Sequence, residues 1–550
     1  MARLPKDPMS ILPLLPILLL LAGALAILLG RVARFNRSDT IASIASALAL
    51  LAMLLMATPG RPASETLVSA WQPLSVFGTP VSLRVDPAGW LIGFVAVAAC
   101  AATALAGIAY PGRQRFASRV LALGMTAALV FAVFSANLLT LALAWGLFDA
   151  LFAIAVLARS EGAQVDRRTA FAVGFNGAAT VCLWLAALAL NQAHQSQYWH
   201  LAELSDSARD FLALAALLRL GLYPLSQSLP EERDDAPGRV ALLYVLPPLA
   251  GLHLLVRLAD LDALPANSVL IAPAALSILI GGALAWWRGR SREALPYLAL
   301  SSIGAVVLSG LSSRPTSAPP AVLANGAAAW AMAIMTLSFG RGFDRHRPWW
   351  SVGYALAFAT LVGIPASLGF VVQTSLASGL ADASLLLIAM ILIGEALTFA
   401  ALIRLATTPA PNKAPGTRAA IAAYAGAIAL TALLPFLLPA LGRSIIPTLA
   451  PPSFEVALSS LGLLGGVLFA LPSVLAGALE WVTHDWPAAP HADPARWLSL
   501  GWLYDLILRM IGGLAGALRG LARVLEGEGA VLWALLILIA AYVILSGSIQ

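Results

Sequence analysis

Long apolar stretches are the feature that most constrains how this sequence can fold. Runs of about 20 mostly apolar residues, each long enough to cross a bilayer as a helix, recur along the whole chain. Backbone groups inside a bilayer must be satisfied internally, which favours helices for such runs. We therefore predict an all-α, multi-pass membrane protein with about sixteen spans. The runs lie near 11–30, 40–58, 88–110, 118–134, 137–158, 170–190, 208–226, 238–258, 268–287, 295–312, 320–340, 351–373, 384–407, 418–440, 456–478 and 529–548.

Composition supports the membrane prediction. Hydrophobic residues make up 60% of the 550 residues and charged residues only 11%, against roughly 45–50% and 25% in soluble domains. So few charges cannot cover the surface of a water-soluble protein of this length. The formal net charge is +6, but the basic residues are spread over short segments rather than gathered in a patch, so no nucleic-acid partner is expected.

The basic residues alternate along the chain, which predicts its orientation. Segments rich in Arg or Lys are expected on the cytoplasmic side of the membrane. With an even number of spans, both termini are then predicted on the periplasmic side. The basic set comprises Arg31, Arg34, Arg37, Arg113, Arg115, Arg119, Arg159, Arg167, Arg168, Arg288, Arg290, Arg292, Arg341, Arg345, Arg347, Arg404, Lys413 and Arg418.

The C-terminal part is predicted to differ from the rest. Residues 494–528 mix apolar side chains with charges at helical spacing, a pattern typical of an amphipathic helix lying along a membrane surface or another subunit. A plain cytoplasmic connector is the alternative. Residues 529–550 then form a last transmembrane helix.

Two segments carry a family resemblance. Residues 219–240, beginning Arg-Leu-Gly-Leu-Tyr-Pro, resemble without a gap the pattern Lys-x-Gly-x-x-Pro-Phe-His-x-Trp-Leu-Pro-x-x-x-Glu-x-Ala-Pro-x-Pro-Val. Residues 363–373, Gly-Ile-Pro-Ala-Ser-Leu-Gly-Phe-Val-Val-Gln, are similar to Gly-x-Pro-Pro-x-x-Gly-Phe-x-x-Lys, and 137–145 and 298–303 add weaker matches. Over about residues 90–410 the chain thus resembles the antiporter-like, proton-conducting membrane subunits of respiratory complex I, membrane-bound hydrogenases and Mrp antiporters.

The resemblance implies two inverted five-helix repeats, at 118–258 and 268–407. Residues 1–110 would supply N-terminal transmembrane helices, and 418–478 additional ones. Each repeat should contain a helix broken at mid-membrane, marked here by Gly221 with Pro224 and by Gly363 with Pro365. Interrupted helices at corresponding places in two repeats are typical of transporters, and the freed backbone groups favour a hydrated path.

The family's buried charges are mostly replaced in this sequence. The resemblance implies a Glu after the Trp of the fifth helix, and Lys residues on the seventh, eighth and twelfth helices. The corresponding residues here are Gly146, Arg219, Pro248 and Gln373, and the family's His is Ser226. A guanidinium stays protonated in proteins, so Arg219 can hold a counter-charge but cannot pass its proton on.

Four residues remain as candidates for a proton path. Asp149 lies one helical turn after Gly146 and is placed to pair with Arg219. His253 and Glu395 each stand within an apolar run, and ionisable residues inside a membrane are functional candidates by default. Structural anchoring is the alternative for each of the four. We predict a degenerate antiporter-like subunit with an interrupted proton path.

Several functions fit such a subunit. The leading one is a membrane-arm subunit of a redox-driven complex, either a complex-I-like NADH:quinone oxidoreductase or a membrane-bound hydrogenase. The sequence has no iron–sulfur, haem or nucleotide motif, so no cofactor is expected on this chain, and redox chemistry is expected on partner subunits. An Mrp-type cation/proton antiporter subunit and the membrane partner of an inorganic-carbon uptake system are the alternatives. A stand-alone channel is disfavoured by the motifs, and the resemblance implies a bacterial inner membrane.

Overall fold

The computed structural model divides the chain into two compact units, Met1–Ala488 and Ala489–Gln550, and each is described by itself. In the first unit the structure describes residues 12–33, 37–56, 65–69, 79–110, 116–158, 167–201, 203–225, 239–264, 269–288, 292–312, 319–339, 351–407, 417–445 and 454–483. In the second it describes isolated positions between 498 and 539, all of them helical. The predicted amphipathic helix at 494–528 and the predicted last span at 529–550 therefore lie largely outside the described residues.

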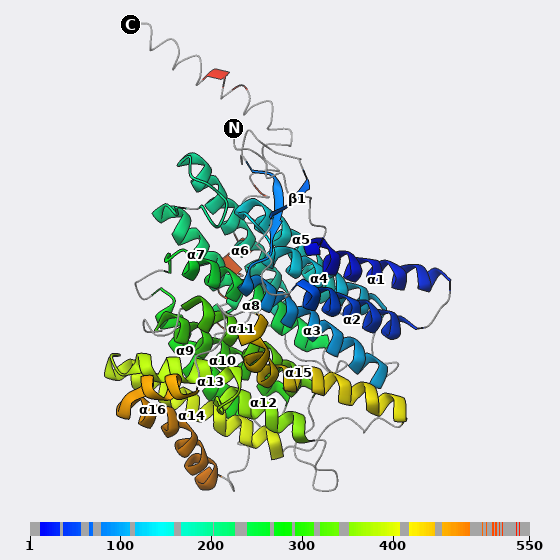
Figure 1. The fold of residues 1–550 in the computed structure, drawn as a ribbon. Coiled ribbons are helices and arrows are strands. Elements are labelled where there is room, and N and C mark those ends of the chain that lie inside the picture. Colours follow the sequence, from blue (N-terminus) through cyan, green and yellow to red (C-terminus); the bar gives the residue numbers. More distant parts are fainter. Residues whose placement is uncertain are drawn as a thin grey trace, which may run out of the picture. The chain divides into compact units, whose positions relative to one another are not determined.

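Helices make up nearly all of the described part of the first unit (Figure 1). The first eight are α1 (Leu15–Val32), α2 (Ser38–Met56), α3 (Pro87–Ala109), α4 (Phe116–Val133), α5 (Leu138–Leu157), α6 (Arg167–Gln192), α7 (Asp206–Leu220) and α8 (Arg239–Asp260). The others are α9 (Ile271–Trp287), α10 (Leu295–Leu311), α11 (Pro319–Phe339), α12 (Val352–Val362), α13 (Leu368–Leu380), α14 (Leu385–Thr407), α15 (Arg418–Ile445) and α16 (Phe454–Thr483). Two short 3₁₀ turns, η1 (Leu12–Leu14) and η3 (Arg292–Ala294), precede α1 and α10.

The prediction of an all-α, multi-pass membrane protein is confirmed. Among the described residues, 11 helices are long and apolar enough to cross a membrane, and four shorter apolar helices accompany them. The helices coincide with the predicted apolar runs to within a few residues at most ends. The grouping into two inverted repeats and the proposed domain boundaries stay predictions.

Three helices form the centre of the first unit. The apolar stretches of α8 and α11 are buried along their whole length, and that of α3 is buried along most of it. α11 packs against α3, α8, α10, α12, α13 and α15. By contrast, α1, α2 and α16 expose apolar side chains over much of their length. Exposed apolar helices around a buried helical centre fit a protein whose solvent is lipid rather than water.

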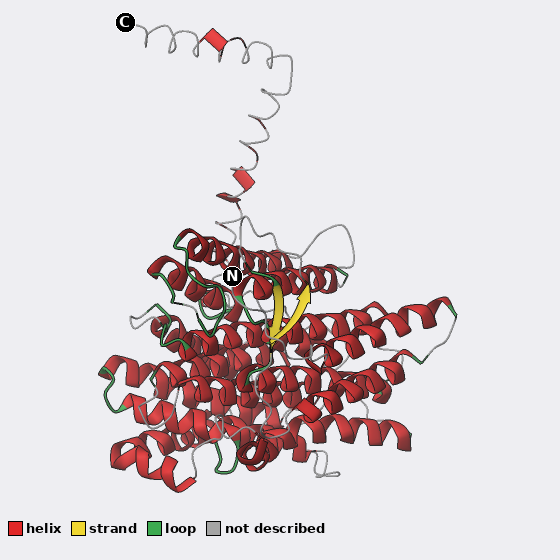
Figure 2. Ribbon diagram, turned by 45° about the horizontal axis from the view of Figure 1, so that its top comes forward, coloured by secondary structure: helices red, strands yellow, loops and turns green. Residues whose placement is uncertain are grey.

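A β-hairpin between α2 and α3 is an addition that the sequence analysis did not predict. Strands β1 (Glu65–Ser69) and β2 (Val81–Arg84) pair antiparallel (Figure 2). The turn between α4 and α5 holds β2 in place, since the Arg84 amide donates to the Phe134 carbonyl and the Ala136 amide to the Ser82 carbonyl. The hairpin therefore lies against the N-terminal end of α5, the helix that carries Asp149.

Asn137 joins this hairpin to α5. Its side-chain oxygen accepts from the Thr140 amide at 2.8 Å and caps the helix, while its amide nitrogen donates to the Pro80 carbonyl at 2.8 Å. We expect Asn137→Ala to destabilise the protein by about 1–3 kcal/mol, because it removes a cap and leaves buried partners unsatisfied. Faster hydrogen exchange in the first turn of α5, with the last turn unchanged, would confirm it. Unchanged exchange in that first turn would contradict it.

Two helices end at glycines with positive φ. α7 ends at Gly221 (φ 63°) and α12 ends at Gly363 (φ 79°), both in the left-handed conformation that glycine adopts without strain. Pro224 and Pro365 follow them. The apolar run 351–373 is thus interrupted and divided between two helices, α12 and α13. The residues that follow Leu225 lie outside the described residues, so a break within one helix at Gly221, and the mid-membrane position of both breaks, stay predictions.

Candidate functional site

Arg219 and Asp149 form an ion pair where α7 ends. Arg219 lies in the last turn of α7 and its side chain is 0% exposed, while Asp149 on α5 is 14% exposed. Arg219 Nη1 donates to Asp149 Oδ1. The pairing foreseen from helical spacing is therefore present, and its role in moving protons stays a prediction.

The surroundings of this pair come from α5 and α6. The Arg219 guanidinium carbon lies 4.4 Å from the centre of the Trp145 ring and 4.9 Å from that of Phe148. Thr180 Oγ1 donates to Asp149 Oδ2 at 2.5 Å, and Asn176 contributes a backbone carbonyl 3.4 Å from Arg219 Nη1. Aromatic faces and a carboxylate together stabilise a buried cation. The arrangement holds a fixed positive charge, and it cannot pass that charge on as a proton.

The position that corresponds to the family's Glu lies on the edge of this site. A side chain starting at Gly146 would meet no atom within 4 Å. Asp149, one turn later, instead supplies the carboxylate that reaches Arg219. The carboxylate that pairs with Arg219 is therefore supplied from a position one turn after Gly146 on α5.

A second polar site lies beside the break between α12 and α13. Gln373 on α13 donates from Nε2 to Glu395 Oε2 at 3.2 Å and to the Leu361 carbonyl at 3.3 Å. Glu395 on α14 is only 4% exposed. Both side chains line a cavity with room for water molecules, together with Ser302, Thr360 and Thr398. The structure thus brings together two residues that the sequence analysis had treated separately.

His253 lies apart from both sites, on α8. It is 0% exposed, and neither ring nitrogen makes a hydrogen bond to the described residues. One turn later, Arg257 forms an ion pair with Asp86, whose carboxylate also caps α3 by accepting from the Gly89 amide. Pro248 is buried within α8, and Ser226 lies outside the described residues.

Sequence reasoning missed two further buried ion pairs. Arg119 on α4 binds Asp39 on α2, with its second nitrogen 2.7 Å from Asp39 Oδ2. Arg404 on α14 binds Glu480 on α16 at 2.5 Å and Thr483 at 2.7 Å. The sequence analysis had placed both arginines in basic segments between the apolar runs. One indication of these pairs was present in the sequence: Asp39 and Glu480 are acidic residues in or beside apolar runs, where a buried carboxylate needs a partner.

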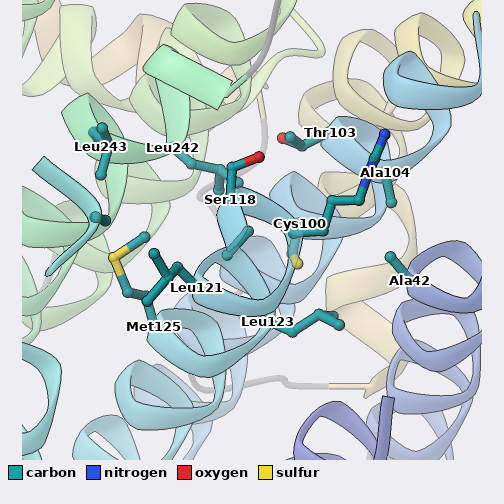
Figure 3. Close-up of a pocket in the computed structure, with 13 residues that line it drawn as sticks. Ala42, Cys100, Thr103, Ala104, Ser118, Leu121, Leu123, Met125, Leu242 and Leu243 are labelled. Atoms are coloured by element: carbon teal, nitrogen blue, oxygen red, sulfur yellow. The ribbon is translucent and has the colours of Figure 1, made fainter. Parts of the chain in front are cut away.

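A cavity next to the Arg119–Asp39 pair is lined mainly by apolar side chains (Figure 3). Leu121, Leu123 and Met125 of α4 contribute to it, as do Leu242 and Leu243 of α8. Because Arg119 is already paired with Asp39 through two nitrogens, the described residues that line the cavity offer a ligand no unpaired charge. Among the described residues, no group of three or more His, Cys, Asp or Glu side chains could hold a metal ion.

Comparisons with known proteins identify similar chains. No family model matches this sequence. NADH-quinone oxidoreductase subunit N of Ruthia magnifica subsp. Calyptogena magnifica is 24% identical over 187 residues, which cover 29% of this chain and 37% of that protein. The chain thus matches well under half the length of this curated relative.

Solved structures share the fold over almost the whole chain. A chain of the Mrp complex from Dietzia sp. DQ12-45-1b superposes with a TM-score of 0.75 at 18% identity, covering 98% of this chain and 63% of that one. A chain of the membrane-bound sulfane sulfur reductase, an archaeal respiratory membrane complex, gives 0.67 at 16% identity, with 96% and 99% covered. One from Thermus thermophilus respiratory complex I gives 0.57 at 21% identity, with 80% and 100% covered. The resemblance to antiporter-like membrane subunits is confirmed.

Proposed function

We propose that this chain, which has the fold of the antiporter-like membrane subunits, is a membrane-arm subunit of a redox-driven, proton-translocating complex. The observation that carries the proposal is the Arg219–Asp149 pair at the end of α7. It keeps opposite charges at the place where the resemblance implies a Glu–Lys pair. The redox centres are proposed to lie on partner subunits.

The proposed proton path is interrupted within this chain. A relay needs groups that accept and release protons in turn. Arg219 keeps its proton, and Pro248 and Gln373 have none to exchange. His253 and Glu395 can titrate, but a guanidinium, a proline and an amide occupy the positions of the family's lysines. Asp149 and Arg219 then form a fixed charge pair that stabilises the fold rather than a step of the relay.

The chain is a multi-pass membrane protein. Its similarity to a bacterial protein supports a location in a bacterial plasma membrane. The alternation of basic segments supports an orientation with both termini on the periplasmic side. Labelling of single cysteines introduced near each terminus of the chain, in intact cells, tests this orientation. Labelling by a membrane-impermeant reagent is expected at both ends, and protection of either end would contradict it.

Affinity purification in a mild detergent tests the function most broadly. We expect subunits that carry iron–sulfur clusters, a quinone site or a hydrogenase centre to co-purify with the chain and to be identified by mass spectrometry. Recovery of one large soluble partner, or of the chain alone, would contradict the assignment to a redox-driven complex.

An Mrp-type cation/proton antiporter subunit is the second candidate. It is favoured by the likeness to the Dietzia Mrp chain, which has a TM-score of 0.75 and covers 98% of this chain. The same purification separates the two candidates, because small antiporter subunits without redox centres would then be recovered.

A further inference from the structure

We propose that Glu395 is a proton-binding carboxyl group of this chain and that the cavity beside Gln373 is where it exchanges its proton with water. The inference deepens the proposed function. It rests on that function only for the role of the bound proton in proton translocation. The binding itself follows from the surroundings of Glu395. Transfer from a hydronium ion forms one O–H bond on the carboxylate and leaves one water molecule, so no other reactant is needed.

Glu395 differs from the other partly or fully buried carboxylates of the described residues in its partner. Each of the others forms an ion pair with an arginine, so that it faces an opposite charge inside the protein. Glu395 instead accepts a hydrogen bond from the neutral amide of Gln373 at 3.2 Å, and no described cation pairs with it. The arginine-paired set is Asp39 with Arg119, Asp86 with Arg257, Asp149 with Arg219 and Glu480 with Arg404.

This difference decides which carboxyl can change its charge. Burying an ionised carboxylate without a cation is unfavourable by several kcal/mol or more, and binding a proton removes that cost. An amide donor can hydrogen-bond either form of the carboxyl group. Glu395 can therefore exist in both states, whereas protonating Asp149 would leave the Arg219 guanidinium buried without a counter-charge.

Among the side chains that the structure describes, the other titratable groups on the elements packed against α14 have partners of their own. α14 packs against α9, α10, α12, α16 and the η3 turn. Tyr354 of α12 donates its hydroxyl to the Leu402 carbonyl at 2.5 Å. Glu480 of α16 binds Arg404 of α14 itself. Of the rest, Glu293 of η3 binds Arg288, whose guanidinium lies over the ring of Tyr297 on α10.

The cavity gives this carboxyl group space for water beside it. It is lined by the hydroxyl-bearing residues Ser302, Thr360 and Thr398 as well as by Gln373 and Glu395. Polar side chains in a space large enough for water are the conditions under which buried water is retained. The adjacent break between α12 and α13 also frees backbone carbonyls, and the Leu361 carbonyl accepts from Gln373 Nε2.

Close helix packing fixes the direction of Glu395. Gly394, the preceding residue, touches α9 so closely that a Cβ there would lie 2.7 Å from the Ile278 carbonyl oxygen. One turn further along α14, Thr398 and Ser301 of α10 share a hydrogen bond of 2.6 Å. With these contacts α14 presents the Glu395 carboxyl group to Gln373 and the cavity.

Infrared difference spectroscopy of the full-length chain in lipid vesicles tests the proposal. A protonated carboxyl absorbs at a higher frequency than a carboxylate, so a pH step should produce a protonated-carboxyl band from Glu395. We expect Glu395→Gln to abolish that band and Glu480→Gln, which changes an arginine-paired carboxylate, to leave it. Gln373→Leu should keep the band and shift it to higher frequency, because one hydrogen bond is lost.

A protonated-carboxyl region that is the same in Glu395→Gln as in the wild-type chain, at every pH at which both stay folded, would overturn the proposal. Glu395→Asp serves as the control for folding, since it keeps a carboxyl group and should keep a band. The readout does not depend on partner subunits. Its failure would therefore leave the proposed complex untouched, and failure of the co-purification would leave the proton site untouched.

Discussion

Asp149→Asn is expected to destabilise the folded chain by about 3–5 kcal/mol, the range for breaking a buried ion pair from one side. The variant keeps the size of the side chain and removes its charge. Arg219, with a side chain 0% exposed, is then left inside the protein without a counter-charge. The free energy of unfolding in mixed lipid–detergent micelles, measured by titration with SDS, checks this value.

The double variant Asp149→Leu with Arg219→Met is the matched control. It removes both charges and leaves neither stranded, so its unfolding free energy should stay close to that of the wild type. The exposed pair Arg209–Asp206 on α7 supplies a second control, because Asp206→Asn should have no measurable effect. If Asp149→Asn were as stable as Asp206→Asn, the buried pair would not have the energetic role given to it here.

Gly369→Ala is expected to have the other large effect, a loss of about 3 kcal/mol, at the upper end of the range for overpacking. Gly369 lies in the first turn of α13, directly against the last turn of α12. A Cβ there would overlap the carbonyl oxygen of Thr360. Because the obstacle is backbone rather than a flexible side chain, the two helices would have to separate where they meet.

Gly174→Ala provides the comparison for that substitution. It adds the same methyl group to a helix at a position with no atom within 4 Å, and alanine is the better helix former. Its unfolding free energy should equal or exceed that of the wild type. Equal stability of the Gly369 and Gly174 variants would contradict the close approach of α12 and α13.

The sequence was sufficient to predict the elements whose signal is local. Each span depends on its own run of apolar residues, and the helix ends at Gly221 and Gly363 depend on glycines followed by prolines. The division of 351–373 between two helices was harder to see, since apolar residues continue through the break. The hairpin was not predicted, because strands of five and four residues are too short to show a clear alternation of apolar and polar residues.

The partners of the buried charges could be predicted only in part. Asp149 and Arg219 were linked through the family's known pairing and one turn of helix. Arg119 and Asp39 are 80 residues apart, and Arg404 and Glu480 are 76 apart, with no local pattern to connect them. Gln373 of α13 and Glu395 of α14 meet because both helices contribute side chains to one cavity. Such contacts depend on how the helices are packed, which periodicity does not encode.

The measurement that tests the account most directly is proton translocation by the assembled complex that contains the double variant Asp149→Leu, Arg219→Met. Assembly is checked first by co-purification, and the number of protons moved per turnover is then compared with that of the wild type. An interrupted path through this chain predicts an intact complex with the same number of protons per turnover. An intact complex that moves fewer protons, or none, would show that protons pass through the Arg219–Asp149 pair and would contradict the account.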